Sequence, residues 1–356
     1  MKVAIGFGGP ASGGDPSAWE RAVEFVCEAE RLGVDVAWSA EAWGQDAVTP
    51  LAFLAARTTR IGLGTGIMQI SARAPSMTAM TALTLAAISG NRFRLGLGAS
   101  GPQVVEGLHG VPFAKPLERM REVIEIVRLA FRGEPLRYTG KHYVLPRPGG
   151  EGKPLRLAQP ANPSIPIYLA TLGPASLELT GELADGWLGT SFIPEAAASE
   201  VLPHIARGAE KAGRKLADLD LAVGASVEFG GDVARMVAAR KPALAFTLGA
   251  MGSRKHNFYN AAYRRAGYED AGVEVQRLWL EGRRDEAAAR VPDEMVLRTS
   301  LLGDDAAVRE RLRAFRDAGI TSLRLDPAGK GVRERLDTLA RAMDLVRQVS
   351  AERGRP

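Results

Sequence analysis

The residues of this chain that could do chemistry lie in short segments that follow predicted strands. Residues 96–101 read G-x-G-x-x-G, a pattern of dinucleotide sites, although in a barrel such glycines would instead let a flat ligand approach the backbone. Residues 171–176 join a strand end to a helix start, where free amides and the helix dipole favour a phosphate, with a plain helix cap as the alternative. Pro102 interrupts the helix that a dinucleotide site needs, so residues 171–176 are the stronger anion candidate.

Glu41 is the one carboxylate directly after the second predicted strand, and Trp43 lies two residues beyond it. An acid in this position could handle a proton, and it could equally cap a helix or form a salt bridge. The four histidines have no metal-ligand spacing and stand in no nucleophile–base motif, so no metal site is predicted. Phe258 and Tyr259 start a helical segment, where an aromatic pair packs more often than it lines a pocket.

The composition excludes several classes of protein. With one cysteine among 356 residues, the chain has no intrachain disulfide framework, which predicts a reducing, cytoplasmic compartment. Aromatic residues make up 6% and the basic residues are scattered, so a nucleic-acid partner is not expected. No apolar run reaches the roughly 18–20 residues of a membrane span. The net charge of +5 fits a solvated basic surface or a protein that handles small anions.

Strand-like and helix-like segments alternate along the chain and decide where these residues meet. Strands are predicted at residues 2–7, 35–39, 61–67, 93–98, 165–170, 186–190, 219–229 and 320–325. Eight such units predict a (β/α)8 TIM barrel, with a doubly wound open sheet as the alternative. Residues 230–302, between the seventh and eighth strands, are helix-like and predict a helical insertion within a single domain, 1–356. In a barrel the active site lies at the carboxyl ends of the strands, where the segments above are found.

Five motifs in this order are typical of one known superfamily. They are WGQD at 43–46, LGTGI at 63–67, LGASGPQVVEG at 97–107, YLATLGP at 168–174 and ADGW at 184–187. The chain resembles the bacterial-luciferase-like superfamily and, within it, the oxidoreductases that use the deazaflavin coenzyme F420, such as the methylenetetrahydromethanopterin reductases. The resemblance implies a (β/α)8 barrel, hydride transfer between the deazaflavin and a small organic substrate, and a homodimer. An FMN-dependent monooxygenase of the same fold and a binding protein without turnover are the alternatives.

The resemblance also implies where the cofactor binds. Family members have a non-prolyl cis peptide in the third strand, behind the cofactor ring, and this peptide maps to Gly66–Ile67. The phosphate would rest on the amides around Gly173 and Ala175. The implied cofactor-binding residues are Phe7, Gly8, Trp43, Thr65, Gly66, Ile67, Gln69, Gly98, Ala99, Ser100, Gly101, Thr171, Leu172, Gly173, Pro174 and Ala175.

One branch of the superfamily, the sugar-phosphate dehydrogenases, has an acidic residue and then a catalytic histidine after the second strand. Here the pair is Glu41–Ala42, which argues against the sugar-phosphate reaction. Glu41 takes the acidic position and would handle the proton if it is buried. Gln103 or Ser100 would supply hydrogen bonds at the edge of the ring.

Overall fold

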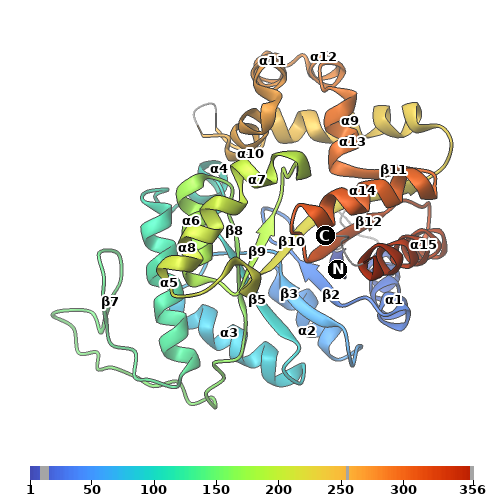
Figure 1. Ribbon diagram of the computed structural model, residues 1–356. Coiled ribbons are helices and arrows are strands. Elements are labelled where there is room, and N and C mark those ends of the chain that lie inside the picture. The colour runs from blue at the N-terminus through green and yellow to red at the C-terminus, as the bar shows by residue number, and fades with distance from the viewer. Residues whose placement is uncertain (9–15, 254–255, 353–356) are drawn as a thin grey trace.

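Eight parallel strands form a closed barrel in the computed structural model, which describes residues 1–8, 16–253 and 256–352 (Figure 1). In order around the barrel the strands are β1 (Lys2–Phe7), β2 (Val36–Ser39), β3 (Gly62–Thr65), β5 (Phe93–Gly98), β8 (Ile167–Ala170), β9 (Gly186–Gly189), β10 (Asp220–Phe229) and β12 (Ser322–Pro327). Because β10 pairs with both β9 and β12, the sheet has no free edge at this point. The predicted (β/α)8 barrel is confirmed, and the open sheet is excluded.

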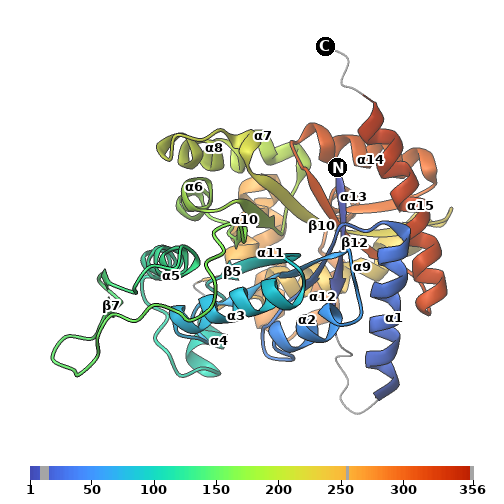
Figure 2. The same cartoon turned by 90° about the horizontal axis from the view of Figure 1, so that it is seen from below.

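Helices cover the outside of the barrel, as Figures 1 and 2 show from two directions. They are α1 (Pro16–Leu32), α2 (Val48–Ala55), α3 (Pro75–Ile88), α4 (Pro102–Gly107), α5 (Pro116–Phe131), α6 (Pro174–Leu183), α7 (Ala197–Glu200), α8 (Leu202–Lys211), α14 (Asp305–Asp317) and α15 (Val332–Ala351). In α5, Met120, Val123, Ile124 and Val127 recur at helical spacing and are buried, which fixes the face that packs on the barrel. Several of these helices begin with proline, which suits the first helical position because its missing N–H has no partner there anyway.

The predicted third strand is two short strands. β3 ends at Thr65, and the chain resumes as β4 (Met68–Gln69) after a cis peptide between Gly66 and Ile67. Both strands pair with β5, so the sheet continues across the interruption. The alternation of residues in the sequence does not by itself reveal this interruption.

The segment between β10 and β12 is helical, as predicted, but it also contains a strand. Its elements are α9 (Val233–Gly249), α10 (Phe258–Tyr263), a π-helical turn (Arg264–Tyr268), α11 (Glu269–Leu280), α12 (Arg284–Ala289), α13 (Asp293–Thr299) and the strand β11 (Ser300–Gly303). β11 pairs in parallel with the carboxyl half of β10 and was missed because four residues are too few to show a period. The helices of the segment share an apolar core that includes Met236, Leu248, Val275 and Leu278.

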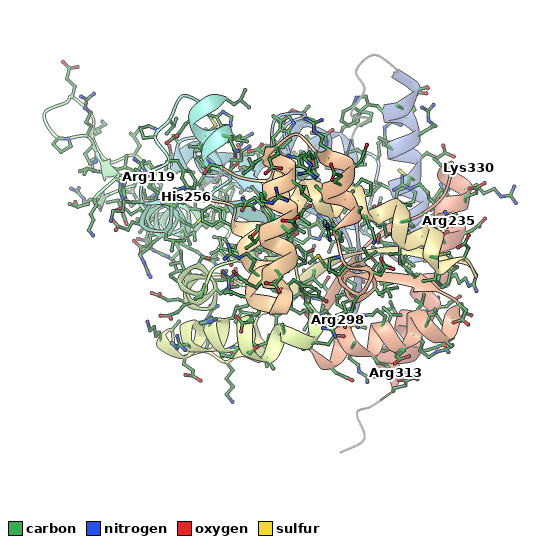
Figure 3. The ribbon with its side chains drawn as sticks, turned by 90° about the horizontal axis from the view of Figure 1, so that it is seen from above. Arg119, Arg235, His256, Arg298, Arg313 and Lys330 are labelled. Carbon is green, nitrogen blue, oxygen red and sulfur yellow. The ribbon has the colours of Figure 1, made fainter. Side chains whose placement is uncertain are left out.

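The Pro- and Gly-rich stretch after α5 forms a small hairpin of β6 (Tyr138–Thr139) and β7 (Val144–Leu145), which projects from the barrel in Figure 1. Basic side chains are spread around the molecule, as the labelled Arg119, Arg235, Arg298, Arg313 and Lys330 show in Figure 3. Among the helices that the structure describes, none has both the length and the apolar character needed to cross a bilayer.

Gly96 of β5 leaves no room for a side chain against the backbone of β3. A Cβ atom there would lie 1.8 Å from the carbonyl oxygen of Thr65. We therefore expect Gly96→Ala to lower the free energy of unfolding by about 3 kcal/mol, because only a shift of the backbone can relieve the overlap. Gly6→Ala, in β1, is the matched control, since nothing lies within 4 Å of a Cβ at that position. Denaturant unfolding measures both variants, and equal losses of stability would contradict this account.

Candidate functional site

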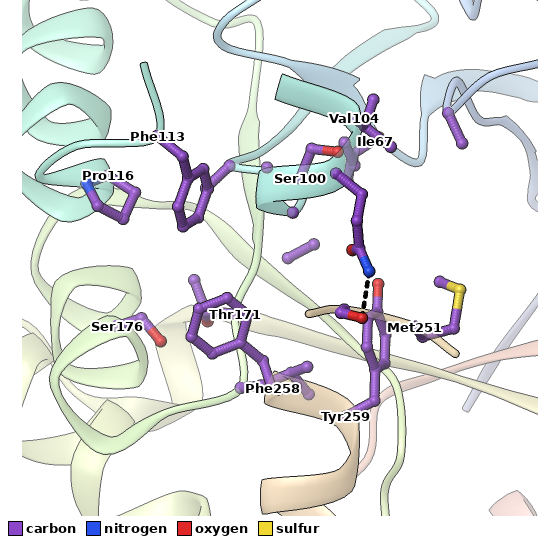
Figure 4. A pocket seen from close by; sticks show the side chains of 18 of the residues that line it. Ile67, Ser100, Val104, Phe113, Pro116, Thr171, Ser176, Met251, Phe258 and Tyr259 are labelled. Atoms are coloured by element: carbon purple, nitrogen blue, oxygen red, sulfur yellow. Dashed lines mark hydrogen bonds between the residues drawn. The ribbon is translucent and has the colours of Figure 1, made fainter. Parts of the chain in front are cut away.

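A cavity of about 1230 Å³ opens at the carboxyl ends of the adjacent strands β2, β3, β5 and β8. Helix α4, the first turns of α5 and α6, and residues of α9 and α10 complete its wall. Its volume exceeds the roughly 300–1,000 Å³ of common small-molecule sites. Figure 4 shows Ile67 and Ser100 on one wall, Phe258 and Tyr259 on the facing wall, and Pro116 and Ser176 toward one end.

Most of the predicted site residues line this cavity, although they are far apart in the sequence. They meet because parallel strands of a barrel end at the same rim. The predicted residues that line it are Glu41, Trp43, Gly66, Ile67, Gly98, Ala99, Ser100, Gly101, Gln103, Thr171, Leu172, Gly173, Pro174 and Ala175.

The predicted cofactor-binding residues Phe7, Gly8, Thr65 and Gln69 are not part of the cavity wall. Phe7 is buried and packs edge-on against Trp19, with ring centroids 6.0 Å apart. The buried hydroxyl of Thr65 donates to the Gly96 carbonyl and accepts from the Gly96 amide, both at 2.8 Å. The side-chain amide of Gln69 is buried too and donates to a backbone carbonyl of the segment after β2. Apart from Gly8, which has no side chain, these residues support the strand ends and do not reach the cavity.

The Gly66–Ile67 peptide is cis, as the resemblance implied. The side chain of Ile67 lines the cavity, and Gly98 of β5 lies directly behind it. A Cβ at position 98 would approach a side-chain carbon of Ile67 to 2.9 Å. Gly98 is therefore required for the packing of Ile67, and Gly96 for the approach of Thr65, whereas the sequence suggested that these glycines make room for a ligand.

Glu41 is held by four donors. Its carboxylate accepts from both terminal nitrogens of Arg73, at 2.6 and 2.9 Å, and from the backbone amides of Gln69 and Ala47, at 2.7 and 3.2 Å. The side chain is 7% exposed. A carboxylate with both oxygens engaged in this way ties together β4, the start of α2 and the loop that carries Arg73. The geometry favours the salt-bridge alternative over a role in proton transfer.

We expect Glu41→Gln to lower the free energy of unfolding by about 2 kcal/mol, because it leaves the partly buried Arg73 without its counter-charge. Arg73→Met in the same background should recover part of this loss, since it removes the unpaired cation. Denaturant unfolding of both single variants and the double variant gives the coupling energy between the two side chains. A coupling energy near zero would contradict the structural role of this ion pair.

The first turn of α6 combines both sequence-based alternatives, a helix cap and free amides. The amide of Gly173 donates to the Ser176 hydroxyl at 3.0 Å, and that hydroxyl donates to the Gly173 carbonyl at 2.8 Å. The next hydrogen bond runs from the Leu177 amide to the Gly173 carbonyl, at 2.9 Å. The amides of Ala175 and Ser176 precede Leu177 in the first turn, where helix amides have no intrahelical acceptor and can bind anions. The amide of Gly173, predicted to contact phosphate, is used by the cap.

Several lining residues were not predicted from the sequence. They include Phe113 and Lys115 before α5, Phe246 in α9, Met251, and Phe258 and Tyr259 in α10. The aromatic pair at 258–259 was noted but interpreted as packing, and the structure places it in the cavity wall. The side-chain amide of Gln103 donates to the carbonyl of Gly252, drawn as a dashed line in Figure 4, so Gln103 joins α4 to the segment before α10.

The charged side chains of the cavity wall all have partners. Glu41 pairs with Arg73, and Lys115 lies 3.8 Å from Glu118, which also contacts Lys141 at 3.5 Å. Lys115 also has a positive φ of 52°, and Ser100, another lining residue, has a φ of 58°. Such conformations are rare outside glycine and often occur at functional sites. In the described part of the chain, no group of three or more acidic, histidine or cysteine side chains is arranged to hold a metal ion.

Residues 1–322 match the family model for luciferase-like monooxygenases. The chain is 43% identical, over 309 residues, to a Mycobacterium tuberculosis protein named as a coenzyme F420-dependent oxidoreductase, which covers 84% of this chain and 88% of that protein. This chain is also 30% identical to the 5,10-methylenetetrahydromethanopterin reductase of Archaeoglobus fulgidus, and the match covers 84% of this chain and 87% of the reductase. The solved structure of the coenzyme F420-dependent tetrahydromethanopterin reductase from Methanopyrus kandleri has the same fold, with a TM-score of 0.76 and 24% sequence identity. The superposition covers 95% of this chain and 97% of that chain.

The chain therefore belongs to the luciferase-like monooxygenase family. The family predicted from the five motifs is confirmed, and so is the prediction that the chain is an enzyme of this group.

Proposed function

We propose that this chain is an F420-dependent oxidoreductase that transfers a hydride between the deazaflavin ring and a small organic substrate, in the cytoplasm. The observation that carries the proposal is the cavity itself, which has unused helix amides toward one end and an apolar, glycine-bordered shelf around Ile67. Its volume of about 1230 Å³ leaves room for a substrate beside a tricyclic cofactor. The 43% identical relative is named for the same cofactor.

The residues present fit a cofactor that has a planar ring and a phosphate. The amides of Ala175 and Ser176 would hold the phosphate, and Ile67 would support the ring from behind. When bound, the deazaflavin supplies a carbon that donates or accepts a hydride. The chain contributes the alignment of two planes and the exclusion of water, which the apolar wall provides. FMN also has a planar ring and a phosphate, so an FMN-dependent monooxygenase is the alternative.

Fluorescence titration of the apoprotein with F420 and, separately, with FMN tests the cofactor. Ala175→Asp sharpens the test, because a carboxylate in the first turn of α6 suits the helix dipole but repels a phosphate. We expect tight binding of F420 to the wild type, binding at least tenfold weaker to Ala175→Asp, and an unchanged melting temperature. Asn has the size of Asp but no charge, so Ala175→Asn should bind F420 more tightly than Ala175→Asp.

Two results would contradict the cofactor proposal. One is stronger binding of FMN than of F420, which would favour the monooxygenase. The other is equal F420 affinity in the wild type and both variants of Ala175, which would show that the phosphate does not bind at the start of α6.

We also propose that the chain forms a homodimer through the outer face of α2 and α3. Met77, Met80 and Ile88 recur on one face of α3 and are 50%, 42% and 54% exposed, and Phe53 of α2 is 47% exposed. Large apolar side chains gathered on neighbouring helices are typical of a protein interface. A second copy of the chain would cover them.

Light scattering after gel filtration tests the dimer. We expect Met80→Glu to shift the protein from dimer toward monomer, because it places a charge in an apolar interface. Val273→Glu is the control, since Val273 is 48% exposed but lies on α11, far from α3 (Figure 1). A monomeric wild type, or a dimer that Met80→Glu leaves intact, would rule out this interface.

A further inference from the structure

Aromatic side chains make up part of the cavity wall, and two of them, Phe258 and Tyr259, face Ile67 (Figure 4). Phe113 precedes α5, Phe246 belongs to α9, and Phe258 and Tyr259 begin α10. The rings of Phe113 and Phe258 lie 6.4 Å apart, and Phe246 and Phe258 are 38% and 39% exposed. Exposed aromatic surface in a cavity wall indicates that an apolar molecule covers it when the site is filled.

The charges of the cavity wall indicate that this molecule is not an anion. The Glu41 side chain is 7% exposed and is bound to Arg73, and Lys115 lies 3.8 Å from Glu118. An anionic group beside the aromatic wall would lose hydration, and the aromatic side chains offer it no counter-ion. The wall therefore selects against anionic compounds.

Tyr259 is the polar group in this aromatic wall. Figure 4 shows its hydroxyl next to the hydrogen bond between Gln103 and Gly252, on the side of the cavity away from Ser176. Burial raises the pKa of its phenol, so the hydroxyl keeps its proton and remains a donor. The Thr171 and Ser176 hydroxyls are hydrogen-bonded within the chain, and Ser100 lies on the facing wall, beside Ile67.

We propose that Tyr259 is a catalytic residue that donates a hydrogen bond, and then a proton, to the heteroatom of an apolar ketone or imine that has no anionic group. This inference rests on the proposed function, since the hydride comes from the reduced deazaflavin. The substrate carbon gains the hydride, and the electron pair of its C=O or C=N bond moves to the heteroatom. The heteroatom takes the proton from Tyr259, whose phenolate regains a proton from water at the cavity mouth. The substrate gains two electrons, and the reduced deazaflavin loses them.

Three matched probes separate the parts of this proposal. Acetophenone is an uncharged aromatic ketone, 4-acetylbenzoate adds a negative charge, and α-methylstyrene replaces the carbonyl oxygen with CH₂. Their affinities are measured by calorimetry on protein loaded with oxidised F420, which has no hydride to give, so that binding is read without turnover. The variants are Tyr259→Phe and, as a control, Tyr138→Phe, which removes a phenol that is bonded to Glu125 outside the cavity.

We expect the wild type to bind acetophenone at least tenfold more tightly than 4-acetylbenzoate. Tyr259→Phe should weaken the binding of acetophenone about tenfold and leave the affinity for α-methylstyrene unchanged, because only the ketone accepts the hydrogen bond. With reduced F420, kcat for acetophenone should fall about 100-fold in Tyr259→Phe and stay unchanged in Tyr138→Phe.

If Tyr259→Phe lowers the affinities for the ketone and the alkene equally, or lowers neither, the role of Tyr259 is overturned. Comparable affinity for the charged and uncharged ketones, or no binding of any probe, would overturn the substrate class. The F420 titration described above is independent of these results. If F420 does not bind, the proposed function fails, while titration of the apoprotein with the same probes still tests the aromatic wall and the Tyr259 hydroxyl.

Discussion

The close contact between β3 and β5 is the constraint on which the rest of the site depends. The carbonyl of Thr65 occupies the space where a side chain at Gly96 would begin, and the Thr65 hydroxyl fixes this contact with two hydrogen bonds to the backbone of Gly96. With the two strands held this closely, β3 ends at Thr65 and the pairing resumes at β4. Ile67, in the interruption, points into the cavity and packs on Gly98. The shelf on which we place the cofactor ring is therefore a consequence of strand packing.

The contacts around this shelf hold the neighbouring strand ends at fixed positions. The Glu41–Arg73 pair connects the end of β2 to β4 and to the segment before α3, and the Ser176 hydroxyl closes the first turn of α6. Because these groups are used within the chain, few of the polar groups at the rim remain for a ligand. Those that remain include backbone amides at the start of α6 and the hydroxyls of Ser100 and Tyr259. A site of this kind binds its ligands through shape and a few hydrogen bonds.

The barrel and its rim could be predicted from the sequence because buried parallel strands and amphipathic helices leave clear periodic patterns. The partner of Glu41 could not, since Arg73 lies 32 positions away and its contact depends on the path of the chain after β4. Thr65 and Gln69 were assigned to the site by resemblance to the family, whereas their side chains are used in hydrogen bonds to the backbone of Gly96 and Ala42. The strand β11 was too short to show a period, and the cavity-lining role of Phe258 depends on how α10 packs across the barrel.

The cavity is built from two parts of the chain, the barrel and the helical segment between β10 and β12. Its floor comes from barrel strand ends, and much of its aromatic wall comes from residues 230–302. Contacts between the two parts include the bond from Gln103 to the Gly252 carbonyl, the bond from Arg265 to the Leu172 carbonyl at 2.7 Å, and the rings of Phe113 and Phe258. In the function we propose, the floor holds the ring and the phosphate of the cofactor, and the aromatic wall faces the substrate. On this proposal, substitutions in the wall change the substrate without disturbing the cofactor, provided that the contacts between the two parts are kept.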